Sequence, residues 1–139
     1  MSMPPFHLAF PIYDIEETRE FYVNLLNCNV GRESERWIDF DFYGHQISAH
    51  VRPEELDKVN TNPVDGKNVP VRHFGLILKW DDWQALSQKL QDAKASFIIE
   101  PYIRFEGEVG EQATMFVSDP SGNGLEFKSF KDPSQVFAK

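Results

Sequence analysis

A glutamate that follows a tight turn is the residue of this sequence best suited to chemistry. The turn, Asp-Pro-Ser-Gly-Asn-Gly at 119–124, contains the proline and glycines that supply the fixed and positive φ angles of tight turns. In the alternating strand that follows, Glu126 shares a face with Lys128, while Leu125 and Phe127 point to the opposite, apolar face. A carboxylate held on a rigid strand is suited to bind a metal ion or to act as a base; the alternative is an ordinary solvated residue.

Two histidines occupy matching places in two other predicted strands. His7 lies in the strand 6–12 and His73 in the strand 71–78, each on the face opposite the larger apolar residues. A lone strand histidine is more often a hydrogen-bonded polar residue than a metal ligand. Two histidines at matching positions, together with Glu126, favour the metal hypothesis.

The elements around these residues form the same series twice, which predicts an α+β fold of two βαβββ modules. Asp14 and Asp81 are the expected N-caps of two helices, which end at Leu26 and near Ala95. The other predicted strands cover residues 37–42, 45–51, 97–100 with 102–105, 113–118 and 125–130, with a short strand between 28 and 36. Each helix must bury its apolar stripe on one face of its sheet. We therefore expect a curved mixed sheet around a shared cleft, with the helices on the outer face.

The expected domain organisation follows from this repeat. We predict a single domain over residues 1–139, with module 1 at about 5–52 and module 2 at about 71–131. The segment 53–70 is rich in proline, asparagine and glycine, which predicts a linker. With 139 residues, 41% of them hydrophobic, the chain has enough apolar material for one core.

Composition and charge restrict the classes of partner. A net charge of −8 opposes nucleic-acid binding and anionic membrane surfaces, and leaves a small molecule or a protein as the expected partner. No apolar run approaches the length of a membrane span, and the N-terminal residues do not resemble a secretory signal. Cys28 is the only cysteine, which excludes an internal disulfide and a cysteine-based zinc site. We therefore expect a cytoplasmic protein.

The repeat also predicts where the candidate ligands meet. A pseudo-two-fold axis between the modules would bring His7 and His73 together, with Glu126 directed into the same cleft. Such a set with open positions suits Fe(II), and its mixed nitrogen and oxygen ligands also suit Mn, Ni or Zn. His50 shares the cleft face as a fourth ligand, a hydrogen-bond donor to a ligand, or a substrate contact. His45 is not expected to take part.

With its paired modules, its two first-strand histidines and the ending Asp-Pro-Ser-Gly-Asn-Gly-Leu-Glu-Phe at 119–127, the sequence resembles the vicinal oxygen chelate superfamily over residues 6–130. That superfamily includes glyoxalase I, extradiol dioxygenases, fosfomycin resistance enzymes, methylmalonyl-CoA epimerase and bleomycin-binding proteins. The segments 104–108 and 110–116 are similar to its small bacterial glyoxalase/bleomycin resistance/dioxygenase branch. Because this fold hosts several chemistries, the resemblance indicates a superfamily and leaves the reaction open.

The resemblance implies that His7, His73 and Glu126 are the metal ligands and that the substrate is small and chelated through vicinal oxygens. Glyoxalase I has a glutamate in the last strand of its first module, whereas residues 45–51 of this sequence include no carboxylate. The ligand set therefore fits extradiol dioxygenases and fosfomycin enzymes better than glyoxalase I. The superfamily commonly pairs or swaps modules, which implies a homodimer.

Further site residues are assigned from face and charge. The catalytic candidates are Glu126 and His50, and the substrate-binding candidates are Arg104, Lys128, Trp37 and Tyr102. Arg104 would clamp an anionic group of the substrate; the alternative is a surface ion pair with Glu106 or Glu108. Lys128 would hold a substrate carboxylate or phosphate; the alternative is a rim lysine that covers apolar surface. The tryptophan would line the pocket or a dimer contact, and Glu111 is a further cleft candidate.

Three functions are consistent with these residues. The first is a divalent-metal-dependent enzyme, a lyase, an isomerase or a ring-cleaving dioxygenase, in which the metal acts as a Lewis acid on vicinal oxygens. The second is a metal-free small-molecule binding protein of the bleomycin-resistance type, and the third is an interaction domain with a vestigial site. The complete set of candidate ligands favours the enzyme.

Overall fold

The computed structural model describes residues 3–56, 60–64 and 67–139, and these residues form two compact units. Residues 3–56 with 120–122 form the first unit, and the remaining described residues form the second. Among the described residues, no helix has both the length and the apolar character needed to cross a bilayer.

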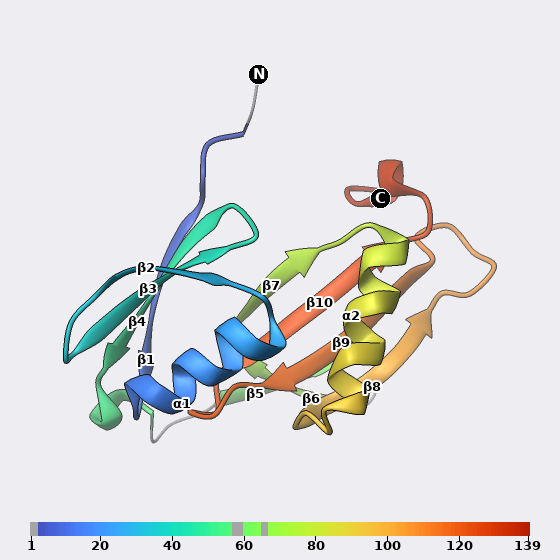
Figure 1. Cartoon of the computed structure of the whole chain (residues 1–139). Coiled ribbons are helices and arrows are strands. Elements are labelled where there is room, and N and C mark those ends of the chain that lie inside the picture. Colours follow the sequence, from blue (N-terminus) through green and yellow to red (C-terminus); the bar gives the residue numbers. More distant parts are fainter. Residues whose placement is uncertain (1–2, 57–59, 65–66) are drawn as a thin grey trace. The chain divides into compact units, whose positions relative to one another are not determined.

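The first unit is a four-stranded sheet covered on one face by a helix (Figure 1). Its strand order is β1-β4-β3-β2, with β1 parallel to β4 and the other pairs antiparallel. The elements are β1 (His7–Ile12), α1 (Ile15–Arg19), the π-helical turn η1 (Glu20–Leu25), β2 (Asn29–Glu33), β3 (Trp37–Phe42), β4 (His45–Val51) and the 3-10 turn η2 (Pro53–Glu55).

Aromatic side chains attach the first helix to its sheet. The fully buried ring of Tyr22 stacks on Phe40 of β3 with 5.0 Å between ring centroids and lies 5.8 Å from Phe10 of β1. Asp14 is the N-cap, as its spacing predicts, because its Oδ2 accepts a hydrogen bond from Glu17 N at 2.9 Å. The π-helical turn in the second half of this helix was not predicted, because α and π turns share similar apolar spacing over so few residues.

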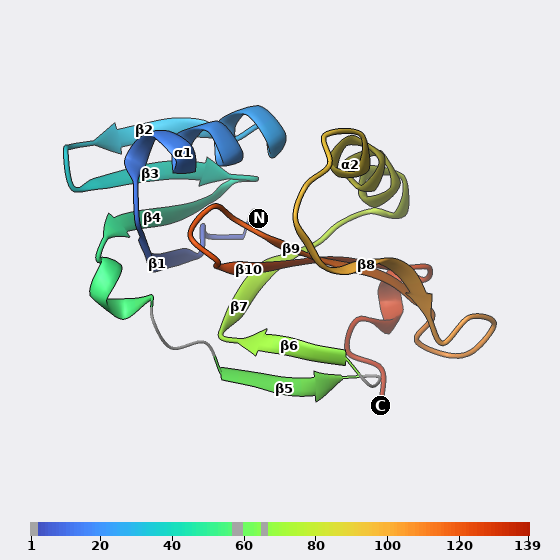
Figure 2. The same ribbon diagram turned by 90° about the horizontal axis from the view of Figure 1, so that it is seen from below.

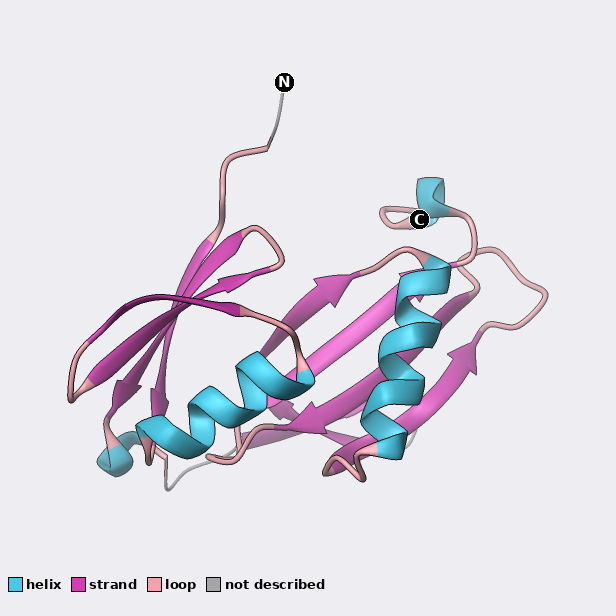
Figure 3. Ribbon diagram, viewed as in Figure 1, coloured by secondary structure: helices cyan, strands magenta, loops and turns pink. Residues whose placement is uncertain are grey.

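The second unit repeats the first with the same topology (Figure 3). Its strand order is β7-β10-β9-β8, and its first strand is again parallel to its last. The elements are β7 (His73–Ile77), α2 (Trp80–Asp92), β8 (Phe97–Arg104), β9 (Gln112–Ser118), β10 (Gly124–Phe130) and the 3-10 turn η3 (Pro133–Gln135). The prediction of an α+β fold with two βαβββ modules is therefore confirmed.

The start of α2 differs from the prediction by two residues. Lys79 is the N-cap, and Asp81 lies inside the first turn with Asp82. Acidic residues in the first turn interact favourably with the positive end of the helix dipole. Asp81 therefore favours the start of this helix through the dipole and not as the N-cap. The helix also ends earlier than expected, at Asp92, and Lys94 adopts a positive φ of 55° just beyond it.

The segment 53–70, predicted as a linker of turns, contains regular structure. Strands β5 (Asn60–Val64) and β6 (Lys67–Val71) form an antiparallel pair that the turn-residue count missed. The Asp-Gly dipeptide between them in the sequence is typical of two-residue hairpins and was the available signal. Prolines at positions 63 and 70 argued against strands here, because proline cannot donate a hydrogen bond to a neighbouring strand. Proline is nevertheless tolerated in an edge strand, at positions where no such donor is needed.

The hairpin and α2 lie on opposite sides of the second sheet (Figure 2). Val69 of β6 is 2% exposed and packs against Ile99 of β8 and Phe116 of β9. On the other side of the sheet, Trp83 of α2 is 5% exposed and donates from Nε1 to the carbonyl oxygen of Phe127 at 2.8 Å. The sheet that carries the candidate site is therefore packed by α2 on one face and, over β8 and β9, by the hairpin on the other.

This hydrogen bond gives a test of how α2 is attached to the sheet. We expect Trp83→Phe to lower the free energy of unfolding by about 2 kcal/mol, because a buried carbonyl loses its donor and the smaller ring leaves a void. Urea denaturation measures the change. Trp80→Phe on the same helix is the control, since Trp80 is only partly buried; equal losses in both variants would contradict the prediction.

Candidate metal-binding site

Two parallel strands bring His73 and Glu126 together in the second unit. In the β7–β10 ladder, His73 is level with Gly124, and Glu126 is level with Gly75. Leu125, on the other face, is fully buried. Glu126 therefore leaves the final turn on the face opposite α2, as the alternation predicts.

The final turn is held by its own aspartate. Asp119 is 4% exposed, and its two carboxylate oxygens accept hydrogen bonds from the main-chain and side-chain nitrogens of Asn123 at 2.8 and 3.0 Å. Gly122 adopts a positive φ of 86°, as the turn requires. Gly124 does not adopt a positive φ; it is needed for space, because an added Cβ would lie 2.9 Å from Cγ of Pro70.

The side chains of His73 and Glu126 face each other at close range. Nε2 of His73 lies 3.4 Å from Oε1 of Glu126, and these side chains are 28% and 15% exposed. Nδ1 of His73 lies 2.6 Å from the carbonyl oxygen of Pro70. Because a carbonyl only accepts hydrogen bonds, Nδ1 carries a proton, and Nε2 is the ring nitrogen that faces the carboxylate.

Two further contacts restrict this pair. The hydroxyl of Thr114, on β9, donates to Oε2 of Glu126 at 2.7 Å. The His73 ring lies edge-to-face against Phe116, with centroids 4.8 Å apart. Each carboxylate oxygen thus has a different neighbour, and both side chains are oriented by groups from other strands. Sequence analysis missed Thr114 and Pro70, because their roles depend on strand register and on the hairpin.

The pair opens into a pocket of about 220 Å³ on this face. Its lining residues are His73, Phe74, Gly75, Leu76, Ile77, Glu126 and Lys128. Lys128 is half-buried and supplies a positive charge beside the carboxylate. The geometry therefore combines a nitrogen donor, an oxygen donor and a cation in one small site.

The two donors fit a divalent metal ion. Two atoms bound to one ion at the usual lengths for histidine and carboxylate, with a tetrahedral angle between them, are about 3.4 Å apart; the observed Nε2–Oε1 distance is 3.4 Å. Within each unit, the described residues contain no group of three or more His, Cys, Asp or Glu side chains placed to share an ion. His7, the third predicted ligand, belongs to the first unit.

The corresponding face of the first unit carries polar side chains in register. His7 is exposed and level with Gln46 of β4, just as His73 is level with Gly124. By the same register, Ser48 occupies the position of Glu126, and its hydroxyl donates to Oδ1 of Asp39 at 2.6 Å. This module therefore has a hydroxyl at the equivalent position, with a carboxylate on the neighbouring strand.

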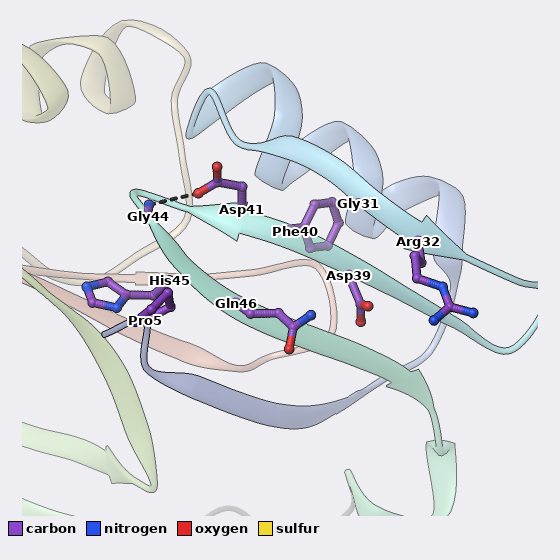
Figure 4. A pocket seen from close by; sticks show the side chains of 9 residues that line it. All are labelled: Pro5, Gly31, Arg32, Asp39, Phe40, Asp41, Gly44, His45 and Gln46. Atoms are coloured by element: carbon purple, nitrogen blue, oxygen red, sulfur yellow. Dashed lines mark hydrogen bonds between the residues drawn. The ribbon is translucent and has the colours of Figure 1, made fainter. Parts of the chain in front are cut away.

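A second pocket, of about 330 Å³, lies within the first unit (Figure 4). Its lining residues are Pro5, Gly31, Arg32, Asp39, Phe40, Asp41, Gly44, His45 and Gln46. Asp41 accepts from Gly44 N at 2.7 Å, and Nδ1 of His45 accepts from Phe6 N at 2.9 Å. Trp37 and His50 are level with each other on β3 and β4, and neither is among the described residues that line this pocket.

The predicted substrate contacts Tyr102 and Arg104 lie elsewhere in the second sheet. Both are on β8, which β9 separates from β10. The ammonium of Lys67 lies 3.9 Å from the centre of the Tyr102 ring, and the guanidinium of Arg104 lies 4.8 Å from that of Phe105. Neither is among the described residues lining the pocket beside Glu126, whereas Lys128 lines that pocket.

Cys28 has the properties of a core residue. It is 3% exposed, and burial, with a smaller effect from the nearby Asp41 charge, raises the pKa of its thiol to about 12. A thiol with such a pKa stays protonated near neutral pH, so it is neither a nucleophile nor a metal ligand there.

Two βαβββ modules, each a mixed four-stranded sheet with one helix, are the fold of the vicinal oxygen chelate class. The chain belongs to the Glyoxalase/Bleomycin resistance protein/Dioxygenase superfamily, whose family model matches residues 5–127. A search of curated proteins finds no match to this sequence.

Solved structures have the same fold. A glyoxalase/bleomycin resistance protein/dioxygenase from Alicyclobacillus acidocaldarius is 32% identical, with a TM-score of 0.80 and coverage of 99% of this chain and 100% of that one. The fosfomycin resistance protein FosX from Listeria monocytogenes is 12% identical, with a TM-score of 0.72 and coverage of 98% and 100%. A putative glyoxalase family protein from Bacillus anthracis is 20% identical, with a TM-score of 0.61 and coverage of 94% and 98%.

Proposed function

We propose that this protein is a divalent-metal-dependent enzyme that acts on a small, oxygen-rich substrate bound through vicinal oxygens. The proposed ligands are His73 and Glu126 of the second unit and His7 of the first. The observation that carries the proposal is the donor pair: Nε2 of His73 and Oε1 of Glu126 are 3.4 Å apart, and each side chain is oriented by its own hydrogen bond. An ordinary surface ion pair does not require such support.

The bound ion would supply Lewis-acid stabilisation of negative charge that develops on a substrate oxygen. The residues of the chain bind and orient the substrate around that centre. Lys128 lines the same pocket as Glu126, so its ammonium is placed to pair with an anionic group of the substrate. Trp37, Tyr102 and Arg104 remain proposed substrate contacts, and His50 remains a proposed catalytic residue.

Metal use by a protein of the same fold supports the proposal. A structure of a FosX variant from Listeria monocytogenes contains Mn(II) and 1S,2S-dihydroxypropylphosphonic acid. That ligand carries vicinal hydroxyls and an anionic phosphonate, which is the kind of substrate a metal beside Lys128 would suit. The reaction proposed for this chain is that of a lyase, an isomerase or a ring-cleaving dioxygenase, and the proposed state is a cytoplasmic homodimer.

The direct test is the binding of a metal alone. The full-length protein is stripped with a chelator and titrated with Mn(II) by calorimetry, beside the variants His7→Ala and His45→Ala. We expect about one Mn(II) per chain, and an affinity at least about tenfold weaker in His7→Ala, because metal ligands contribute strongly to affinity. His45→Ala is the control for the loss of an imidazole from the same unit. His45 is not a proposed ligand, and its Nδ1 accepts a hydrogen bond from the main-chain nitrogen of Phe6.

The outcomes separate the candidate functions. Binding that is weakened only in His7→Ala supports the three-ligand site, and substrate tests with catechols and other vicinal diols would then follow. Binding unaffected by His7→Ala would remove that residue from the site. An inability of the wild type to bind Mn(II), Fe(II), Ni(II) or Zn(II) would overturn the enzyme proposal in favour of a metal-free binding protein.

A further inference from the structure

We infer that Thr114 is a positioning residue that sets the orientation of the Glu126 carboxylate for metal binding; this inference rests on the proposed function. Thr114 lies on β9 and does not line the pocket formed by the described residues around His73. Its hydroxyl donates to Oε2 of Glu126 at 2.7 Å, a short hydrogen bond to a charged group.

The strand register explains why this contact forms. Thr114 is level with Lys128, so it is the diagonal neighbour of Glu126 on the same face of the β9–β10 pair. Diagonal neighbours on antiparallel strands lie about 7–8 Å apart, within reach of a long side chain. The glutamate reaches across to the threonine, and the residue directly opposite it, Phe116, fills the space against the His73 ring.

The contact leaves one oxygen available for the metal. With Oε2 bound by the threonine, Oε1 is the oxygen that faces Nε2 of His73. Without the threonine hydroxyl, rotation of the carboxylate would be less restricted, and ordering it would add to the cost of binding an ion. Thr114 is 2% exposed, so water does not replace its hydroxyl without rearrangement.

A purely structural role is the competing explanation, and the two make different predictions. If the threonine only satisfies a buried hydroxyl, its loss lowers the free energy of unfolding but leaves the metal affinity of the folded protein unchanged. If it positions the glutamate, its loss weakens metal binding in a protein that is still folded.

The test compares Thr114→Val with Thr114→Ser in the full-length protein. We expect valine, which has the same shape without a hydroxyl, to weaken Mn(II) binding by about 10–100-fold, the range measured for groups that orient metal ligands. Serine keeps the donor and is expected to restore most of the affinity. Thr18→Val is the matched control, since Thr18 is fully buried and donates to the carbonyl oxygen of Asp14 at 2.6 Å.

The outcomes are read from calorimetric titration and from the melting temperature of each metal-free variant. Mn(II) affinity equal to wild type in Thr114→Val, or an equal loss in Thr114→Ser, would overturn the role of the threonine while leaving the proposed function in place. Failure of the wild type to bind any metal would overturn both.

A measurement on the wild type covers the case in which the valine variant does not fold. The hydroxyl proton of Thr114 is expected to be visible by NMR in the metal-free protein, because it is buried and hydrogen-bonded. A hydroxyl that exchanges too fast to detect would show that the contact with Glu126 does not persist, and would contradict the inference.

Discussion

Replacement of Gly75 by alanine is expected to lower the free energy of unfolding by at least about 3 kcal/mol, at the upper end for overpacked sites. Gly75 is level with Glu126 in the parallel β7–β10 pair, and a Cβ at this position would overlap the carbonyl oxygen of Glu126. The obstacle is main chain, so it cannot be relieved by a change of rotamer. A domain of this size is stable by only about 5–15 kcal/mol, so the loss is large.

Urea denaturation of Gly75→Ala measures the effect, with Gly31→Ala as the control. Gly31 also lies in a strand, and a Cβ there would meet its nearest neighbour, Cβ of Asp39, at an ordinary 3.5 Å. We expect the control to remain within about 1 kcal/mol of wild type, because the cost of overpacking is absent. A Gly75→Ala protein as stable as the control would show that β7 and β10 are not so closely spaced.

Replacement of Glu126 by glutamine is expected to weaken Mn(II) binding by more than about 100-fold, beyond the range for groups that only orient a ligand. Glutamine keeps the shape of the side chain and an oxygen that can accept from Thr114. It removes the negative charge that favours a divalent ion. The stability of the metal-free protein should change little, which separates ligand loss from misfolding.

Glu111→Gln provides the matched control for this change. Glu111, a cleft candidate from the sequence, lies in the same unit, is 18% exposed and pairs with Lys131 at 3.9 Å. It is not among the described residues that line the pocket beside His73. Its substitution should leave Mn(II) affinity unchanged. If Glu126→Gln bound Mn(II) as tightly as Glu111→Gln did, Glu126 would not be a ligand, and the proposed site would be wrong.

The sequence predicted the fold because its elements follow strong periodic signals. Alternation placed Phe10, Ile38 and Phe127 on core faces, where the structure finds them buried, and it placed Glu126 on the face of its strand opposite Phe127. The same signal could not find the β5–β6 hairpin, because its turn and proline residues also describe a loop. The helix start at Trp80 was missed because acidic residues are favoured both at the cap and in the first turn.

Only part of the candidate site could be predicted from the sequence. The strand face and the final turn indicated His73, Glu126 and Lys128, and the structure places all three around one pocket. The role of Thr114 could be recognised only once the β9–β10 register was known, since threonine is common in strands and its sequence position does not indicate a contact with Glu126. The contact from Pro70 required the hairpin that the sequence analysis did not predict.

The contact between Pro70 and His73 also bears on how this segment can change during evolution or engineering. Connections between elements usually tolerate insertions and deletions. Here the carbonyl group that contacts the His73 ring belongs to Pro70, three residues earlier in the chain. Pro70 follows Val69, which is buried against the second sheet. One residue added between positions 70 and 73 would shift the carbonyl away from the ring while leaving every candidate ligand in the sequence. Length here, as much as composition, should therefore be kept when the segment is grafted, shortened or compared among relatives.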